Sequence, residues 1–541
     1  MRARDVDSLA EGAFDILIVG GGIYGLAIAR EASLRGLRTA LVEADDFGAA
    51  TSFNHQKTAH GGLRSLQSGR LDRARDSILE RRALARLAPR LLRPLPFIVG
   101  TYRSLLKNRL ALAAAFRIDR WLGRRRNEGV EPELHLPPPR LSSRAATLKL
   151  FPGVRPDGLT GGAMWYDYQI VDTSRLAIAF AEAADAHGAR LANYVEALQP
   201  LKETGAIAGM RVRDRLGGRE FDVRARLTIN AAGAHAGAIL RTFGVARELL
   251  LVKAMNLVTS RPASDIALAA PTRGGRMLTL VPWRGTALIG TSQSTDFKTP
   301  ADLSVSAAEI DAFIAEANEA FPALTLTRDD VQLVHRGIVP AERGRGGRPA
   351  LLSAPLIVDH AGDGGPGAMT VIGVKYTTAR GVAARVVRVA ARKLGRSSRR
   401  IRSDAEPLPG AGIADHEALA IETARAAGLE LAPPIIRRLT AIYGDRCAAI
   451  VRLMAERSDW RMPLVSGQTA VGAEVVYVVR HEMACTLADI VIRRTELGAG
   501  GHPGAALVES AARIAGDELG WDDERRTRET AAVDGFYRWN A

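Results

Sequence analysis

The sequence contains very little cysteine: its 541 residues include only Cys447 and Cys485. The two cysteines lie far apart and form none of the spacings that hold a metal ion, and a chain of this length needs no disulfides to stabilise its core. We therefore predict no metal site, and we interpret both cysteines as buried thiols in a reducing compartment.

Aromatic residues and long apolar runs are also scarce. Aromatic side chains make up 5% of the chain and form no stripe interleaved with basic residues, so we expect no nucleic-acid partner. Residues 105–122 are the best apolar candidate for a membrane span, but five charged side chains interrupt them. Acidic residues precede the first apolar segment, where a secretory signal would be basic, so we predict a cytoplasmic protein.

Acidic residues are in deficit over the whole chain. There are 59 Asp and Glu against 74 Lys and Arg, which gives a formal net charge of +15. Such a surface favours anionic partners such as anionic lipids or phosphorylated substrates. Compositional drift in a chain rich in Arg and Ala explains the excess equally well, and both explanations stay open.

The N-terminal region has the pattern of a dinucleotide-binding unit. A buried strand is expected over residues 14–19, a tight turn over 20–25, a helix over 26–35 and a second strand over 39–43. Gly20, Gly22 and Gly25 supply the Gly-x-Gly-x-x-Gly spacing, in which the helix N-terminus receives a pyrophosphate. Glu43 ends the second strand, where its carboxylate can accept a hydrogen bond from a ribose hydroxyl.

The position of this motif favours FAD over NAD, because it opens the chain and no second unit follows for a nicotinamide. The same spacing recurs over residues 362–367, but there it lies between two strand-like runs. We predict that this second match is a hairpin loop.

The remainder of the chain predicts two further parts. Short alternating apolar runs over about 250–365 predict an antiparallel sheet, which with about 100–160 forms a substrate lobe. FAD-binding parts are expected at about 12–100, 160–250 and 365–395, so that residues 1–395 form one oxidoreductase domain of α/β class. Residues 396–412 are interpreted as a linker, and 413–541 as a C-terminal helical domain.

Residues 51–64 read Thr-Ser-Phe-Asn-His-Gln-Lys-Thr-Ala-His-Gly-Gly-Leu-Arg. This segment resembles the FAD-dependent glycerol-3-phosphate dehydrogenase family, in the D-amino-acid-oxidase-like superfamily, where a Thr-Ser stretch runs into His-Gly-Gly-Leu-Arg-Tyr beside the flavin. The likeness continues in the same order through segments at 87–97, 166–176, 230–233, 373–380 and 473–484.

The resemblance implies a doubly wound FAD-binding sheet, an antiparallel substrate domain and a helical cap. It implies oxidation of sn-glycerol 3-phosphate to dihydroxyacetone phosphate, with the electrons passed through FAD to a membrane quinone. It also implies the site residues. The expected catalytic residues are His60, Arg64 and Lys375, and His335 is added to them as a candidate base that the family pattern does not itself supply. The expected FAD contacts, beyond the motif and Glu43, are Thr51, Ser52, Gly61, Gly62, Gly233, Gly373, Lys375, Thr377 and Thr378.

The sequence departs from the family where substrate should bind. Ser65 stands in place of a Tyr, Asn256 in place of a His, and Val339 and Ala354 in place of two Arg. Asparagine cannot act as a base, and valine cannot bind phosphate. Arg336 and Arg343 are candidates to replace the missing cations and His335 to replace the base, so the predicted substrate contacts are Arg64, Asn256, Arg336 and Lys375.

Several alternatives follow from these departures. The chain is either a dehydrogenase of the family type, a diverged dehydrogenase or oxidase of another small hydroxy or amino compound, or a flavoprotein without catalysis. The basic stretch 117–126, which includes Trp121 and Leu122, is either a solvated face or a contact with anionic lipid on the inner face of the cytoplasmic membrane. A homodimer is a further expectation.

Overall fold

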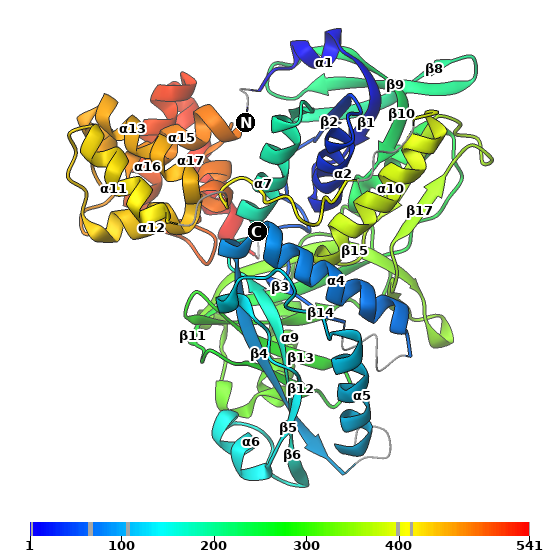
Figure 1. The fold of residues 1–541 in the computed structure, drawn as a ribbon, viewed down its shortest axis with the longest axis vertical. Coiled ribbons are helices and arrows are strands. Elements are labelled where there is room, and N and C mark those ends of the chain that lie inside the picture. The colour runs from blue at the N-terminus through cyan, green and yellow to red at the C-terminus, as the bar shows by residue number, and fades with distance from the viewer. Residues whose placement is uncertain (2–3, 63–68, 104–108, 397–400, 412–414, 540–541) are drawn as a thin grey trace. The chain divides into compact units, whose positions relative to one another are not determined.

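The computed structural model describes residues 1, 4–62, 69–103, 109–396, 401–411 and 415–539. It divides into two units, which are drawn in Figure 1 and described separately below. Unit 1 comprises Met1–Phe53, Asp172–Leu251 and Val339–Arg538, and unit 2 comprises Asn54–Val171, Val252–Ile338 and Trp539–Ala541. Unit 2 therefore begins at Asn54, earlier in the chain than the boundary near residue 100 that the sequence suggested.

Unit 1 is built on a parallel sheet. Strand β1 (Ala13–Val19) pairs in parallel with β2 (Thr39–Val42) on one side and β10 (Glu220–Asn230) on the other. All but the first residue of β1 are buried, as expected for a strand covered on both faces. The sheet runs in the order β17, β18, β10, β1, β2, β7, which confirms the predicted doubly wound architecture. The other strands of this order are β7 (Arg190–Ala192) and β17 (Leu356–Asp359) at its ends and β18 (Ala368–Ile372) between β17 and β10.

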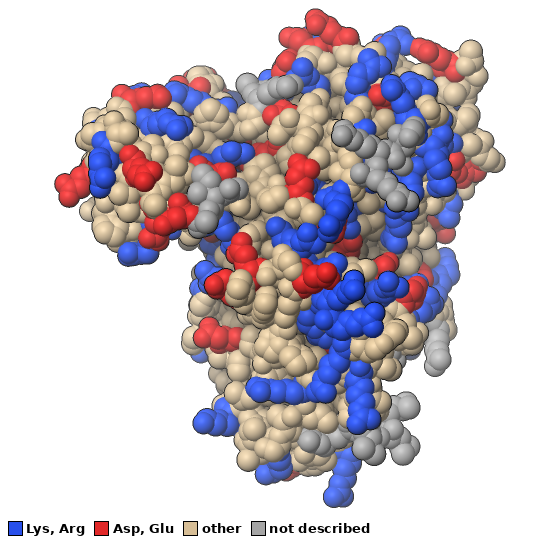
Figure 2. All heavy atoms as spheres, viewed as in Figure 1, with Lys and Arg blue, Asp and Glu red and all other residues tan. Residues whose placement is uncertain are grey.

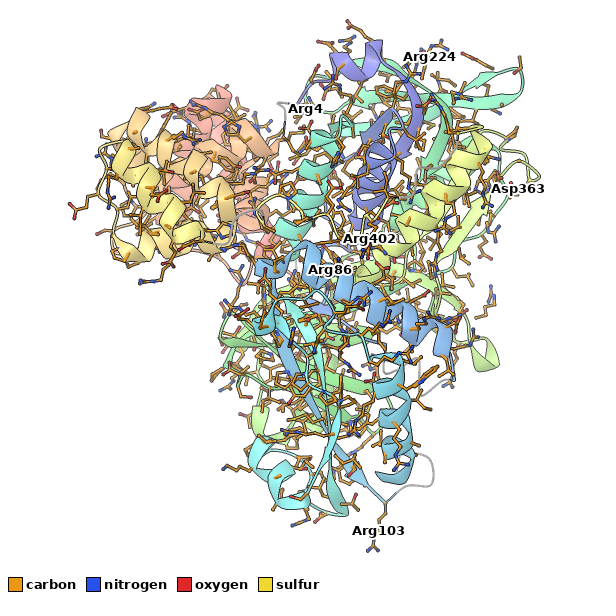
Figure 3. The ribbon with its side chains drawn as sticks, in the orientation of Figure 1. Arg4, Arg86, Arg103, Arg224, Asp363 and Arg402 are labelled. Atoms are coloured by element: carbon orange, nitrogen blue, oxygen red, sulfur yellow. The ribbon has the colours of Figure 1, made fainter. Side chains whose placement is uncertain are left out.

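Three helices pack against one another beside this sheet. Helix α2 (Ile23–Leu34) contacts both α7 (Thr173–Ala186) and α10 (Ala379–Lys393). Helix α7 begins at Asp172, whose carboxylate accepts hydrogen bonds from the amides of Ser174 and Arg175. Residues 362–367 lie in the hairpin between β17 and β18, at the position of Asp363 in Figure 3, so the second glycine motif is a loop as predicted.

The C-terminal part of unit 1 is helical and has its own apolar core, to which Leu439, Ile450, Val475 and Val508 belong. Helix α15 (Gly472–Glu482) ends where Met483 adopts a left-handed φ of 55°. The described part of the predicted linker is attached to α2, because Arg30 donates to the carbonyls of Ser403 and Glu406 at 3.0 and 2.8 Å. The other helices are α11 (His416–Ala426), α12 (Pro433–Tyr443), α13 (Cys447–Glu456), α14 (Ser458–Arg461), the π-helix Asp489–Arg494, α16 (Ala505–Leu519) and α17 (Asp523–Tyr537).

Unit 2 contains the predicted antiparallel sheet. Strands β11, β14, β13 and β12 are neighbours, and β12 pairs in parallel with β4, which pairs with β6. Helix α9 (Ala307–Ala320) packs Ile310 and Phe313 onto Leu257 and Ile289 of this sheet. The bounds are β4 (Leu92–Tyr102), β6 (Leu159–Ile170), β11 (Leu251–Pro262), β12 (Ala267–Pro271), β13 (Met277–Trp283) and β14 (Thr286–Gln293).

Two helices of unit 2 carry much of its basic sequence. They are α4 (Leu71–Leu87) and α5 (Arg109–Leu122), and Figure 2 shows basic side chains in the region where Figure 1 places them. Helix α5 ends at Leu122, before the end of the predicted basic stretch. Within the described residues, no helix is both long and apolar enough to cross a bilayer. Of the two cysteines, Cys447 is buried as predicted, whereas Cys485 is only half-buried.

Candidate flavin site and substrate residues

The turn between β1 and α2 requires glycine at two positions of its motif. Gly20 has a φ of 110°, and a Cβ atom there would lie 2.7 Å from the carbonyl oxygen of Ala231. A Cβ atom on Gly25 would lie 1.8 Å from the carbonyl oxygen of Gly20, which no side chain can tolerate. Gly22 is the N-cap of α2, so the helix begins directly at the turn. This cradle has the form that receives a dinucleotide pyrophosphate.

Glu43 lies beside this turn, at the end of β2. One carboxylate oxygen accepts the amide of Gly21 at 2.5 Å and the other accepts the amide of Asp45 at 2.9 Å. Burial raises the pKa of Glu43 to about 7 in spite of these bonds. The carboxylate therefore stands at the motif's backbone, as expected for the group that binds the adenosine ribose.

Ser52 and Thr51 follow in the turn after this loop. The hydroxyl of Ser52 accepts the amide of Ile23 at 3.0 Å, which satisfies one of the free donors at the start of α2. Thr51 is half-buried one residue earlier. Both residues thus lie at the N-terminus of α2, where the sequence placed a cofactor contact.

The segment after β18 is tied to the same turn through a residue that the sequence analysis did not single out. The hydroxyl of Tyr24 donates to the carbonyl of Lys375 at 2.8 Å and accepts the amides of Val374 and Lys375, each at 3.2 Å. A Cβ atom on Gly373 would lie 2.1 Å from the Tyr24 ring. Burial raises the pKa of Tyr24, so it remains a neutral donor. The sequence signal that could have indicated a role for Tyr24 in the site is its position between Gly22 and Gly25 of the glycine motif.

The remaining predicted FAD contacts of unit 1 lie at the ends of the two neighbouring strands. Thr377 is buried, and the hydroxyl of Thr378 lies 3.4 Å from that of Tyr24. Gly233 follows β10 with a φ of 56° and begins a short 3₁₀ turn, Gly233–His235. The predicted FAD contacts of unit 1 therefore follow the carboxyl ends of β1, β10 and β18. In a doubly wound sheet, ligands bind at the carboxyl ends of the strands.

In unit 2, His60 belongs to a network centred on a buried carboxylate. Asp167 of β6 accepts the amide of Gly61 at 2.6 Å and forms an ion pair with Arg81 of α4. The Nδ1 atom of His60 lies 3.4 Å from Asp167, and its Nε2 atom lies 2.7 Å from the hydroxyl of Thr58. Burial alone would raise the pKa of Asp167, but the contacts with His60 and Arg81 hold it below its usual value. The His60 side chain remains 48% exposed.

Gly61 and Gly62 are restricted by the same helix. A Cβ atom on Gly61 would lie 2.2 Å from the guanidinium of Arg81, and Gly62 has a φ of 85°. Arg81 was not predicted as a site residue because it stands in an Arg-rich helix without a distinguishing motif. Arg64, predicted to be catalytic, and Ser65 lie outside the described residues.

Two adjacent residues of β15 (Val331–Arg343) have different environments. His335 is fully buried, and its ring centroid lies 6.2 Å from that of Trp283. Burial, together with the nearby charge of Lys57, holds the pKa of His335 well below its usual value. Arg336 is half-buried and donates to the carbonyl of Trp539 at 3.5 Å. Within the described chain Arg336 forms no ion pair, and burial lowers its pKa. Among the residues that the structure describes, Arg336 is thus a cation without an acidic partner.

Comparison with known proteins identifies the family. Residues 15–380 match the FAD dependent oxidoreductase family, and residues 401–526 match the C-terminal domain of alpha-glycerophosphate oxidase. A protein named glycerol-3-phosphate dehydrogenase from Synechocystis is 30% identical over 542 residues, which cover 96% of each chain. The mitochondrial glycerol-3-phosphate dehydrogenase of Macaca fascicularis is 30% identical over 97% of this chain and 73% of its own.

This chain belongs to the FAD-dependent glycerol-3-phosphate dehydrogenase family. It is therefore an oxidoreductase whose cofactor is FAD, as the sequence predicted, and the cradle at Gly20–Gly25 fits that cofactor. A solved structure of glycerol-3-phosphate dehydrogenase from Bacillus halodurans, complexed with FAD, has a TM-score of 0.76 at 23% identity and covers 98% of this chain and 96% of its own. That likeness confirms the fold.

Asn256, which stands where the family has a His, and Lys253 on the same strand both have structural contacts. Asn256 is buried on β11, and its side-chain oxygen accepts the hydroxyl of Thr291 at 2.8 Å. Lys253 forms an ion pair with Glu309 at 2.6 Å and donates to the carbonyl of Ser304 at 2.7 Å, which ties it to the start of α9. These bonds explain how both side chains are accommodated.

Proposed function

We propose that this chain oxidises the secondary alcohol of sn-glycerol 3-phosphate to give dihydroxyacetone phosphate. The observation that carries the proposal is the 30% identity to proteins named glycerol-3-phosphate dehydrogenase, which for the Synechocystis protein extends over 96% of both chains. When bound, FAD supplies the acceptor for the hydride that leaves the substrate carbon.

The phosphate is assigned to Arg336. Among the described residues, the half-buried guanidinium of Arg336 has no carboxylate partner, so it favours binding of a phosphate. The phosphate balances the positive charge, and its oxygens accept hydrogen bonds from the guanidinium N–H groups. Arg336 thereby takes the role of the arginine that Val339 replaces. Asn256, whose side-chain oxygen is engaged by Thr291, is assigned to shaping the pocket rather than to proton transfer.

The alcohol proton is assigned to His60. Its ring is accessible, whereas the ring of His335 is fully buried and cannot meet a substrate without rearrangement. Asp167 positions the ring of His60 through Nδ1, in the manner by which a carboxylate fixes the tautomer of a general base. Lys375, whose backbone is held by the hydroxyl of Tyr24, stays a proposed catalytic residue on the family resemblance.

The electron acceptor is proposed to be a quinone reached at an anionic membrane surface. Trp121 and Ile118 of α5 are 65% and 41% exposed. The exposed cations near them in the sequence are Arg117, Arg120, Arg124 and Arg125. A cavity of about 560 Å³ next to them is lined by Arg120, Arg124, Arg125 and Arg126. An exposed aromatic among cations is typical of helices that lie on anionic lipid. A homodimer stays a prediction.

The test is reduction of the bound flavin by substrate in the absence of oxygen. We expect glycerol 3-phosphate to bleach the oxidised-flavin absorption band of the purified protein. A band that persists with glycerol 3-phosphate but bleaches with another hydroxy or amino compound would replace this substrate by the alternative that Asn256 and Val339 favour. A band that persists with every such compound would indicate a flavoprotein without catalysis, and hydrogen peroxide release in air would indicate an oxidase.

A further inference from the structure

A buried network of charges joins the C-terminal helices of unit 1 to the loop after β2. Asp46 stands in this loop, and its side chain has no exposed surface. Its Oδ1 accepts a hydrogen bond from Arg494 Nη2 at 2.7 Å, and its Oδ2 accepts bonds from Arg494 Nη1 at 2.8 Å and Arg493 Nε at 2.7 Å. The carboxylate is therefore held by a forked pair and by a third donor.

The helical side of this network is closed by further ion pairs. Asp489 accepts Arg493 Nη2 at 2.5 Å and the hydroxyl of Tyr194 at 2.8 Å. Glu482 forms a forked pair with Arg175 at 2.5 and 2.8 Å. Three carboxylates thus balance three guanidiniums, and because an unpaired buried charge is costly, each member restricts the others.

The two arginines that reach Asp46 are adjacent in sequence. Successive side chains of an α-helix point about 100° apart, so neighbours seldom share one partner. Arg493 and Arg494 end the π-helix Asp489–Arg494, and π-turns of this kind are frequently found at functional sites. Asn193, which donates to Asp46 at 3.1 Å and to the carbonyl of Met483 at 2.8 Å, adds a further link. Arg4, labelled in Figure 3, donates to the carbonyl of Asn193 at 2.9 Å.

The loop that carries Asp46 forms one wall of the dinucleotide turn. Before Asp46, the Glu43 carboxylate accepts the amide of Gly21 at 2.5 Å. After it, the amide of Gly48 donates to the carbonyl of Gly21 at 3.0 Å, and the ring of Phe47 would lie 2.7 Å from a Cβ atom on Gly21. Any shift of residue 46 therefore moves both sides of the contact with the glycine turn.

We propose that Arg493 and Arg494 are positioning residues for FAD. By holding Asp46 they fix residues 43–48 against the glycine turn, so that the C-terminal helical part is required for tight binding of the cofactor. This role rests on FAD as the family cofactor and does not depend on the identity of the substrate or the electron acceptor.

The experiment compares two matched substitutions in the full-length protein. Arg494→Lys keeps the charge at Asp46 but removes the fork. Arg480→Lys does the same at Glu518, with which Arg480 forms a forked ion pair between α15 and α16 at 2.7 and 3.0 Å. Dissociation of FAD is measured by the rise in flavin fluorescence on dilution, and the melting temperature of each apoprotein is measured separately. Asp46→Asn provides a second variant at the loop itself.

We expect Arg494→Lys and Asp46→Asn to weaken FAD binding by about tenfold or more, because a near-ideal geometry is lost at the cradle. Arg480→Lys should lower the melting temperature of the apoprotein and leave FAD binding within about twofold, since its guanidinium bonds to Glu518 and Glu456 rather than to the network around Asp46. Wild-type FAD affinity in Arg494→Lys and Asp46→Asn would overturn the proposal. So would an equal loss of affinity in Arg480→Lys, because that would show a general loosening of the helical part.

Discussion

Asp167 and Arg81 form an ion pair in which both side chains are only 4% exposed, and the same carboxylate contacts His60. The pair links helix α4 to strand β6 and places the histidine of the His-Gly-Gly motif on a fixed carboxylate. The amide of Gly61 binds there as well, at 2.6 Å. The motif is therefore held by a residue more than a hundred positions away in the sequence.

This arrangement predicts that Asp167→Asn impairs both stability and catalysis. Asparagine leaves the Arg81 guanidinium without its counter-ion and can orient the His60 ring in the wrong tautomer. We expect the turnover number to fall by about a hundredfold or more, as for other residues that orient a catalytic base. The matched control is Asp330→Asn, which breaks the ion pair with Arg261 of the same unit at 3.0 Å. That variant should lose stability and keep its turnover number; a similar fall in turnover there would assign the Asp167 effect to stability alone.

Gly25→Ala should abolish FAD binding. The new Cβ atom would lie 1.8 Å from the Gly20 carbonyl oxygen, so α2 must move away from the turn. Gly535→Ala in α17 is the control, because no atom lies within 4 Å of its added Cβ and alanine favours a helix by about 0.5–1 kcal/mol. The measurement is the flavin content of the purified protein from its visible spectrum. A yellow Gly25→Ala protein with normal FAD content would contradict the assignment of this turn to the cofactor.

The local features of the flavin site could be predicted because the residues that form them are close together in the sequence. The strand, glycine turn and helix at Gly20, Gly22 and Gly25 follow from apolar patterning and from the need to avoid a Cβ atom. The contacts that hold the site were not predictable in the same way. Tyr24 bonds to a loop 351 positions away at Lys375, and no local pattern reports such a partner.

The charge network illustrates the same limit. Asp46 and Arg494 each look like ordinary charged residues in the sequence, and their burial follows only from the packing of helices that are far apart along the chain. Conversely, sequence alone suggested His335 as a base on its residue type, whereas the structure buries its ring completely. Burial is a property of the tertiary fold, so residue identity gives weak evidence about it.

The pKa of Glu43 predicts a pH-dependent stability for the apoprotein. Burial raises this pKa to about 7 in the folded state, above the value of 4.5 expected when unfolded. Because the folded pKa is raised, the favourable contribution is present below the unfolded pKa and is lost as the pH rises toward 7. We therefore expect the melting temperature of the wild-type apoprotein, relative to that of Glu43→Gln, to decrease between about pH 4.5 and pH 7. A difference that is constant over this interval would show that Glu43 ionises normally.

Arg336→Met should raise the KM for glycerol 3-phosphate. Loss of a hydrogen bond to a charged group costs about 1.5–3 kcal/mol, which corresponds to about tenfold to a hundredfold in affinity. The turnover of glycerol, which has no phosphate, should change little if Arg336 binds only that group. Arg343→Met, in the exposed end of the same strand, serves as control. An unchanged KM in Arg336→Met would show that this residue does not bind the substrate. An equal rise of KM in both variants would indicate that the positive charge of the region attracts the substrate without a direct contact to Arg336.

The exposed face of α5 predicts binding to anionic vesicles. Trp121→Ala removes a side chain that is 65% exposed, and Arg124→Glu reverses one of the neighbouring cations. A basic residue near an anionic surface contributes about 1 kcal/mol, so charge reversal should weaken binding to phosphatidylserine-containing vesicles by at least about fivefold. The control is Arg224→Glu, an exposed arginine on β10 of unit 1 that carries the same change in net charge. Co-sedimentation of each variant with vesicles distinguishes the outcomes. If Arg224→Glu weakens binding as much as Arg124→Glu, the attraction arises from the net charge of +15 and not from α5. If only the α5 variants lose binding while flavin reduction by substrate is retained, α5 is the surface that contacts anionic lipid.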